Sequence, residues 1–148
     1  MREEHMKTLF NRQVIIASFL AGCLFGAFLK VVEKLTDSRV YTLLLNVDYI
    51  PIIKNFRFPE LIEFTFHLII SWFITAIVCA IRNKYKWNNA KLMRNSVLIQ
   101  LFIGCMLFPT TNFSNRTPMI TDFVALSWWL VGHIMYGVIL GILLKKRK

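Results

Sequence analysis

The stretch that decides the fold is residues 123–144, FVALSWWLVGHIMYGVILGILL, which contains no Asp, Glu, Lys or Arg. A bilayer core about 30 Å thick needs roughly 20 helical residues, so this stretch predicts a transmembrane helix. His133, Gly137 and Gly141 are four apart and therefore lie on nearly the same face of that helix. The helix thus carries one stripe of small or polar residues on an otherwise apolar surface.

Three further apolar stretches repeat this pattern. Their small or polar residues, again four apart, are Ser18, Gly22, Gly26 and Lys30 in the first, Glu63, His67, Ser71 and Thr75 in the second, and Ser96, Gln100 and Gly104 in the third. In a membrane, such stripes mark the faces that meet other helices rather than lipid. We therefore predict an all-α integral membrane four-helix bundle. It forms a single membrane domain, residues 1–148, with spans at about 12–35, 59–81, 91–110 and 121–144.

Composition supports a membrane protein. The 148 residues are 56% hydrophobic, with a mean hydropathy of +0.53, which is more apolar surface than a soluble domain of this size can bury. The same composition argues against a disordered chain. The net charge of +10 comes from basic residues placed between and after the apolar runs. We therefore expect a lipid bilayer, and no nucleic acid, as the partner.

Basic residues also predict the orientation. Twelve Lys and Arg residues fall on the side of the two termini, and six fall on the other side. The positive-inside rule then places both termini in the cytoplasm, in an N-in/C-in protein of the cytoplasmic membrane. The first outer loop, Thr36 to Phe58, contains the apolar runs Val40–Leu45 and Tyr49–Ile53. Both runs are too short to span, so we expect a membrane-surface segment or a cap over the bundle.

Several residues predict where the helices begin and end. Pro59 opens the second span with Glu60 in its first turn, which suits a helix N-terminus. Pro109 is expected to end or kink the third span. Thr121 or Asp122 is expected to cap the fourth.

Cys23, Cys79 and Cys105 all lie inside apolar runs without metal or disulfide spacing, so we expect three buried small hydrophobes. The stretch Leu20–Cys23 resembles a lipobox, at which a lipoprotein is cut and lipidated. The apolar run continues through Leu29, however, whereas a lipoprotein usually continues with a polar tether. An uncleaved first span is therefore the expected reading.

Ionisable residues on the stripes are the candidate site, because such groups inside a membrane are costly and usually face a partner or water. Glu63 and His67 are one turn apart, and Lys30 and Glu33 form an i, i+3 pair. His133 lies mid-span and needs an interhelical partner. Its candidate partners are Glu63, His67, Gln100 and Lys30. The predicted proton-responsive pocket is Lys30, Glu33, Glu63, His67 and His133.

The glycines of the stripes permit close helix packing. These helix-packing residues are Gly22, Gly26, Gly104, Gly137 and Gly141. If the first and fourth helices pack through their glycine faces, Lys30 and His133 share one interior. The sequence has no phosphate loop, nucleophile elbow or metal-ligand spacing, so we expect no enzyme, no cofactor and no metal.

At several of these residues the chain resembles the YagU-like family of small bacterial inner-membrane proteins. The matching elements are Ala21-Gly22, Phe28-Leu29-Lys30 with Glu33, His67-Leu68-Ile69-Ile70-Ser71, Phe108-Pro109 and Gly132-His133. The stretch Thr36–Arg39 departs from the family's pattern, which has prolines there. The resemblance implies a non-enzymatic protein of the bacterial cytoplasmic membrane with a role in acid survival.

Three functional hypotheses follow. The first is a pocket that responds to protons or a small solute in acid or envelope stress. The second is a structural or accessory subunit, in which the polar stripes only pack the bundle or dock a larger membrane partner. The third is a small-solute transporter or channel, which would need a homo-oligomer because four helices are few for a pathway.

Overall fold

The computed structural model describes residues 11–48, 50, 52, 56 and 58–145, and this part of the chain is helical without strands. Its elements are α2 (Arg12–Thr36), α3 (Val40–Leu45), α4 (Glu60–Lys84), α5 (Asn89–Leu107), the 3-10 helix η1 (Phe108–Phe113) and α6 (Phe123–Leu143). Taking α5 and η1 together, four helices are long and apolar enough to cross a membrane. The predicted four-helix bundle is therefore confirmed, and the protein is a multi-pass membrane protein.

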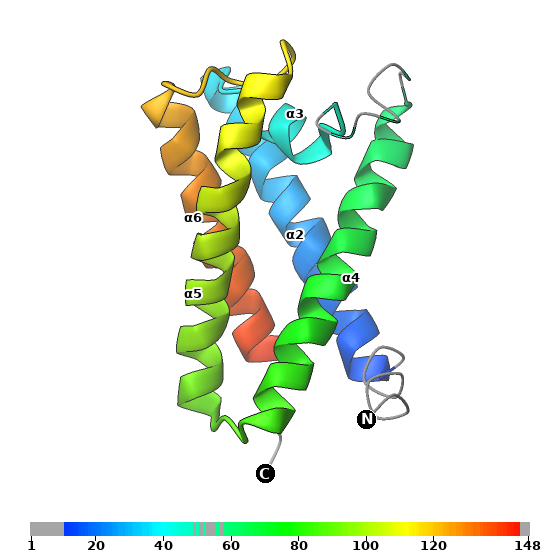
Figure 1. Cartoon of the computed structure of the whole chain (residues 1–148), viewed down its shortest axis with the longest axis vertical. Helices are drawn as coiled ribbons and strands as arrows, with labels where there is room; N and C mark the ends of the chain where they lie inside the picture. Colours follow the sequence, from blue (N-terminus) through cyan, green and yellow to red (C-terminus); the bar gives the residue numbers. More distant parts are fainter. Residues whose placement is uncertain (1–10, 49, 51, 53–55, 57, 146–148) are drawn as a thin grey trace.

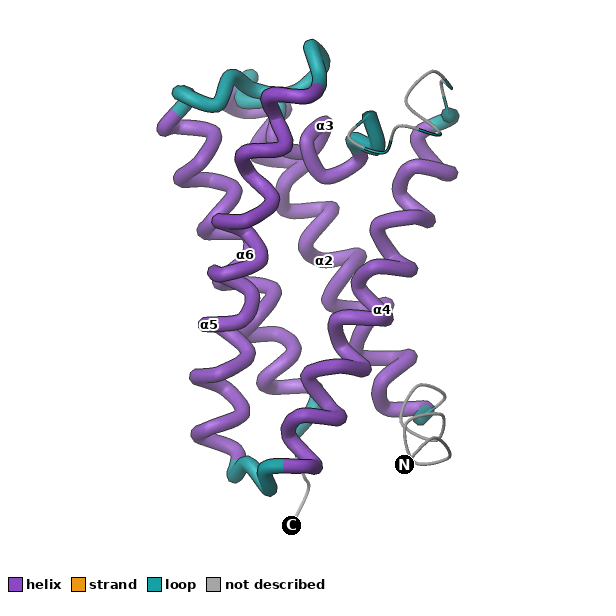
Figure 2. Tube along the Cα trace, viewed as in Figure 1, coloured by secondary structure: helices purple, strands orange, loops and turns teal. Residues whose placement is uncertain are grey.

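The bundle is built from two helix pairs. Figure 1 shows α5 and α6 side by side, whereas α4 crosses α2 and diverges from α5 toward the end that carries α3. Helix α2 contacts both α4 and α6 and so joins the two pairs. Figure 2 shows that α2 begins and α6 ends at the same end of the bundle, opposite α3. We call the end of the bundle where α3 lies the α3 end.

Helix ends follow the local chemistry expected from the sequence. The Asp122 side chain caps α6 by accepting a hydrogen bond from the Ala125 N–H at 2.9 Å. Pro59 is the residue before α4. The α5 helix ends at Leu107, and Pro109 lies in the tighter 3-10 turns that follow, because proline cannot donate the α-helical hydrogen bond.

The first and fourth helices do not pack through their glycine stripes, so the condition under which Lys30 and His133 would share one interior is not met. A Cβ on Gly22 or Gly26 would meet α4 at Leu68, Ser71 and Phe64, whereas one on Gly137 or Gly141 would meet α5 at Val97, Ser96 and Met93. Each stripe instead faces the other helix of its own pair. The contact between α2 and α6 instead uses Gly132, which faces Phe25 and Leu29.

The cysteine expectation holds for one residue of three. Cys79 is buried, Cys23 is half-buried and Cys105 is exposed. Cys105 directly follows Gly104, and adjacent residues lie about 100° apart around a helix. Because Gly104 faces α6, Cys105 is turned toward the surface that lipid covers.

The first part of the loop after α2 covers one end of the bundle. A cap of this kind was one of the two arrangements expected from the sequence. Val40, Leu43 and Leu45 of α3 are buried against the long helices. The second apolar run, Tyr49–Ile53, falls mostly outside the described residues. So do the basic residues of positions 1–10 and 146–148, which entered the orientation argument.

Candidate functional site

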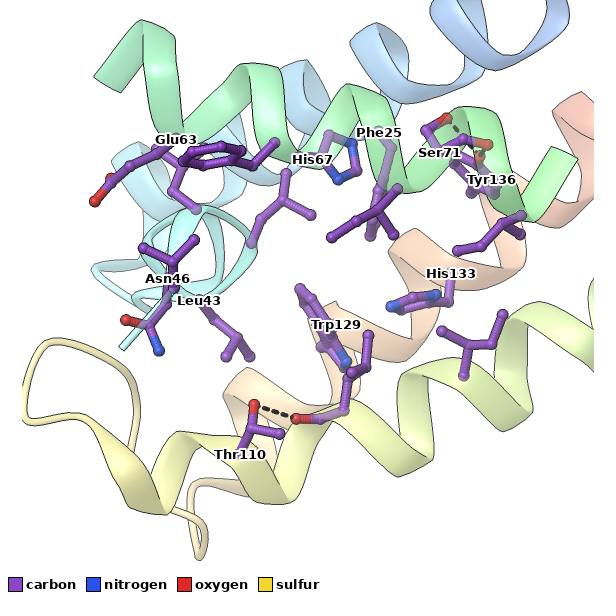
Figure 3. A pocket seen from close by; sticks show the side chains of 18 of the residues that line it. Phe25, Leu43, Asn46, Glu63, His67, Ser71, Thr110, Trp129, His133 and Tyr136 are labelled. Atoms are coloured by element: carbon purple, nitrogen blue, oxygen red, sulfur yellow. Dashed lines mark hydrogen bonds between the residues drawn. The ribbon is translucent and has the colours of Figure 1, made fainter. Parts of the chain in front are cut away.

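A cavity of about 70 Å³ lies between the four long helices below α3. Its polar lining consists of Asn46, Glu63, His67, Ser71, Gln100, Thr110, His133 and Tyr136, and its apolar lining includes Phe25, Leu43, Ile74 and Trp129. Figure 3 shows His67 on α4 and His133 on α6 pointing into the same space. We call this cavity the inner chamber.

His133 lies halfway along α6 and is only 4% exposed. Its Nδ1 is 3.4 Å from Gln100 Oε1 on α5. A side-chain amide oxygen can only accept, so Nδ1 carries the proton and donates. The other ring nitrogen, Nε2, is then an acceptor, and none of the described residues provides a hydrogen-bond partner for it. Of the partners considered from the sequence, Gln100 is the one that the structure places in contact.

Gly104 creates the space for the His133 ring. A Cβ at Gly104 would lie 2.8 Å from His133 Cδ2 and 2.9 Å from Cγ, closer than real contacts allow. The Gly104 carbonyl accepts a hydrogen bond from Trp129 Nε1 at 3.0 Å, and the Trp129 ring stands edge-on to His133 with centroids 4.7 Å apart. The glycine therefore positions two chamber side chains at once.

His67 faces the chamber from α4 and is 9% exposed. Its Nε2 is 3.3 Å from the Gly22 carbonyl oxygen, so Nε2 donates and carries the proton. Phe25 of α2 contacts both histidines, with ring centroids 5.7 Å from His67 and 5.0 Å from His133. Residues from three helices thus bring the two imidazoles to the wall of one cavity.

The end of the chamber nearest the termini is closed by a satisfied hydrogen-bond network. The Ser71 hydroxyl donates to the Ser18 carbonyl at 2.8 Å, so the Tyr136 hydroxyl, 2.6 Å from Ser71 Oγ, donates to it. The Thr75 hydroxyl donates to the Ser71 carbonyl at 2.8 Å. These residues join α2, α4 and α6, and each of their hydroxyl groups has a hydrogen-bond partner within the network.

Three polar atoms of the chamber have no hydrogen-bond partner among the residues that the structure describes. They are Asn46 Nδ2, Gln100 Nε2 and His133 Nε2, on residues that are 2%, 1% and 4% exposed. Elsewhere in the described part of the chain, Ser96 Oγ and Thr111 Oγ1 are also buried without partners. A buried polar group without a hydrogen bond costs free energy, so native proteins usually satisfy it with water or a ligand.

A second cavity of about 360 Å³ lies at the α3 end, and we call it the vestibule. It is lined by Lys30, Glu33, Lys34, Tyr41, Thr42, Leu45, Phe58, Glu60, Glu63 and Arg116.

Lys30 pairs here with Glu60 of α4, not with Glu33 as the i, i+3 spacing had suggested. Glu33 instead holds α3, because its carboxylate accepts from both the backbone N–H and the hydroxyl of Thr42, each at 2.8 Å.

Tyr41 of α3 also contacts Glu60, to which its hydroxyl donates at 2.8 Å. Burial, the hydrogen bond to Glu60 and the nearby carboxylates raise the pKa of the Tyr41 hydroxyl. The hydroxyl therefore stays protonated and remains a donor. This hydrogen bond holds α3, which covers one end of the bundle, against α4.

Glu63 lines both cavities and is 3% exposed. Arg116, in the loop after η1, binds its carboxylate with two hydrogen bonds of 3.0 and 3.2 Å. Arg116 also lies 3.9 Å from Asp48. The hydrogen bonds to Glu63, together with the charges of Glu63 and Asp48, raise the pKa of the Arg116 guanidinium, which stays charged.

The residue set proposed from the sequence therefore divides between two cavities. Glu63, His67 and His133 line the inner chamber, whereas Lys30 and Glu33 line only the vestibule. Sequence reasoning missed Arg116, Asn46 and Tyr136. Arg116 had one available signal, because it is the only basic residue between the third and fourth spans.

Comparison with known proteins adds no relative: no family model matches the chain, and neither a curated protein nor a solved structure matches it. No group of three or more potential metal ligands occurs within residues 11–48, 50, 52, 56 and 58–145. The chemistry of the inner chamber, with its buried imidazoles and unpartnered amide, is therefore the basis for a functional hypothesis.

Proposed function

We propose that this chain is a proton-responsive membrane protein, in which the inner chamber binds a small polar molecule and contributes to acid or envelope stress tolerance. The observation that carries the proposal is that His67 and His133, from different helices, line one cavity in which His133 Nε2 lacks a partner. Histidine is the side chain whose ordinary titration range lies closest to physiological pH.

Protonation would change what the chamber offers to a ligand. With Nδ1 donating to Gln100, neutral His133 presents a lone pair at Nε2. A proton on Nε2 converts that acceptor into a donor. A bound molecule or ordered water that donated to Nε2 would then have to turn, leave or give up its own proton and become the acceptor, which couples occupancy to the proton concentration.

Glu63 offers a route by which the outside could reach the chamber. It lines both cavities, and its charge is held by Arg116 in a loop at the α3 end. In the N-in/C-in orientation inferred from the basic residues, the α3 end faces away from the cytoplasm. The vestibule would then be the side from which the chamber is exposed to external acid.

The biological setting is the part of the proposal that rests on the resemblance to YagU-like proteins. That resemblance supports a bacterial cytoplasmic membrane, a non-enzymatic role and a contribution to acid survival. The geometry contributes the site itself, because one buried imidazole, His133, and the neighbouring Gln100 each have an unpartnered nitrogen in the same cavity.

The test compares acid survival of cells that carry His67→Gln and His133→Gln with wild type at equal membrane protein level. Glutamine retains donor and acceptor atoms but cannot be protonated at these pH values. We expect the double variant to lose the survival advantage that the wild-type chain confers. Unchanged survival would contradict a proton-responsive role.

A matched control keeps the comparison on the same two helices. Thr65 and Ser127 are exposed residues of α4 and α6 whose hydroxyls donate only to the preceding turn of their own helix. The Thr65→Ala and Ser127→Ala double variant should therefore survive acid like wild type. If it fails equally, the histidine effect reflects general damage to the bundle.

A further inference from the structure

We propose that the inner chamber takes a short-chain carboxylic acid in its uncharged form, with the acid O–H donating to His133 Nε2 and the acid carbonyl accepting from Gln100 Nε2. This proposal rests on the proposed function and names the chemical class of its ligand. It starts from two unpartnered atoms of opposite hydrogen-bonding character, which the contact between His133 Nδ1 and Gln100 Oε1 holds on neighbouring side chains.

The hydrogen-bonding pattern selects a carboxyl group. Gln100 Nε2 can only donate, and His133 Nε2, with the proton on Nδ1, can only accept. A carboxylic acid carries one O–H donor beside one carbonyl acceptor and so satisfies both atoms together. A primary amide would match the same pair, but its second N–H would be left without a partner in a buried site, which weakens binding.

The charges around the chamber favour an uncharged ligand. Among the residues that the structure describes, neither Lys nor Arg lines it, and its ionised group, Glu63, is already paired with Arg116. The other titratable groups that face it are His67 of α4 with His133 and Tyr136 of α6, whereas its lining from α2, α3 and α5 is free of charged residues. A carboxylate alone would thus enter an apolar site next to a like charge, which is unfavourable.

Within the complex, the acid proton lies between the ligand and His133, and the atoms and charges balance wherever it resides. Neutral acid beside neutral imidazole and carboxylate beside imidazolium contain the same atoms and the same total charge. In both descriptions, binding of the anion from solution takes up one proton. Binding must therefore strengthen as the pH falls.

The cavity size limits the ligand to a few carbon atoms. An apolar cavity of about 150 Å³ holds benzene, and the inner chamber has about half that volume. Phe25, Ile74 and Trp129 provide an apolar wall for a methyl or ethyl group. Ile70 and Leu107 also line the chamber and are themselves 44% and 36% exposed, so these two residues extend from the chamber wall to the surface of the bundle.

The experiment uses the full chain in nanodiscs and ¹³C-labelled acetic acid as the probe, with binding followed by saturation-transfer NMR between pH 4 and 7. Empty nanodiscs of the same lipid supply the control for partition into the bilayer. We expect saturable binding above that control, falling about tenfold for each pH unit above the acid's own carboxyl range. Acetamide should bind about tenfold more weakly than acetic acid at low pH.

Two variants locate the binding. Gln100→Leu removes the donor and His133→Gln changes the acceptor, and each should weaken acetic acid binding about tenfold, whereas Ser127→Ala should leave it unchanged. Each variant is first checked for a wild-type helical spectrum and elution profile. Binding equal to empty nanodiscs, binding that strengthens with rising pH, or binding unaffected in both variants would overturn the proposal.

The outcomes also separate this inference from the proposed function. If acetic acid does not bind but the histidine variants still lose acid survival, the ligand class is wrong and proton response stands. If acetic acid binds as expected but the histidine variants survive acid like wild type, the chamber is a binding site without the proposed role in acid tolerance.

Discussion

The vestibule and the inner chamber both contain ionisable residues, but they differ in how completely their polar atoms are paired. In the vestibule, Glu33, Glu60 and Glu63 each contact a donor from another element. In the chamber, Gln100 and His133 share one contact and leave a nitrogen each without a partner. The carboxylates of the vestibule are thus more completely paired than the polar side chains of the chamber.

The difference shows that charge alone is a poor marker of function in this bundle. The vestibule carboxylates serve a structural purpose, because they fasten α3 and the loop containing Arg116 over the chamber. The chamber instead retains unsatisfied polar atoms, and buried atoms of this kind need a reason in a native protein. Unpaired nitrogens gathered on the walls of one cavity therefore distinguish the chamber from the vestibule as the candidate site.

The largest expected effect comes from removing the cation that pairs with Glu63. Arg116→Met leaves a buried carboxylate without its partner, which destabilises the bundle by about 2 kcal/mol. The loss is smaller than for a fully buried pair, because the Arg116 side chain is 45% exposed and water screens it. The free energy of unfolding in mixed detergent micelles measures the effect.

A double variant controls this prediction. Combining Arg116→Met with Glu63→Gln removes the uncompensated charge, and the double variant should recover most of the lost stability. A single Arg116→Met variant as stable as wild type would mean that Glu63 is solvated or neutral. The vestibule would then be no better satisfied than the chamber.

A smaller effect is expected from filling the space beside His133. Gly104→Ala puts a methyl group where the His133 ring lies, and the ring must shift, at a cost of about 1 kcal/mol. The sharper measurement is the ¹⁵N spectrum of His133, whose Nδ1 contact with Gln100 should be lost. An unchanged His133 spectrum would contradict the role of Gly104 in positioning the ring.

Gly141→Ala is the matched control on the same helix pair. A Cβ there would lie 2.7 Å from the flexible Met93 Sδ, so packing is disturbed between the same two helices. Neither Gly141 nor Met93 lines the chamber. The His133 spectrum should therefore stay as in wild type, while the cost in stability is comparable.

Much of the fold follows from the sequence, because membrane spans are defined by length and hydropathy and the stripes define buried faces. His67, Ser71, Gln100 and His133 are all buried on the predicted faces. What the stripes do not specify is the partner of each face. Gly22 and Gly137 present the same pattern, yet one packs against α4 and the other against α5.

The chamber was harder to predict for a related reason. Phe25 contacts both histidines, but in the sequence it is one apolar residue within an apolar run. Asn46 lies just beyond α3, and its position in the chamber lining depends on how the loop folds back over the bundle. Sequence spacing gives the face of a residue on its own helix, whereas a cavity depends on the distances between helices.

The smallest effect should come from the exposed ion pair of the vestibule. Lys30 and Glu60 have side chains that are 44% and 56% exposed, so water and salt compete with their attraction. Lys30→Met should cost less than about 1 kcal/mol of unfolding free energy, and the difference from wild type should shrink further in 1 M salt. Glu60 keeps the hydroxyl of Tyr41 as a donor in this variant. A salt-independent loss as large as that of Arg116→Met would contradict this prediction, because it would show that water and salt do not screen the pair of Lys30 and Glu60.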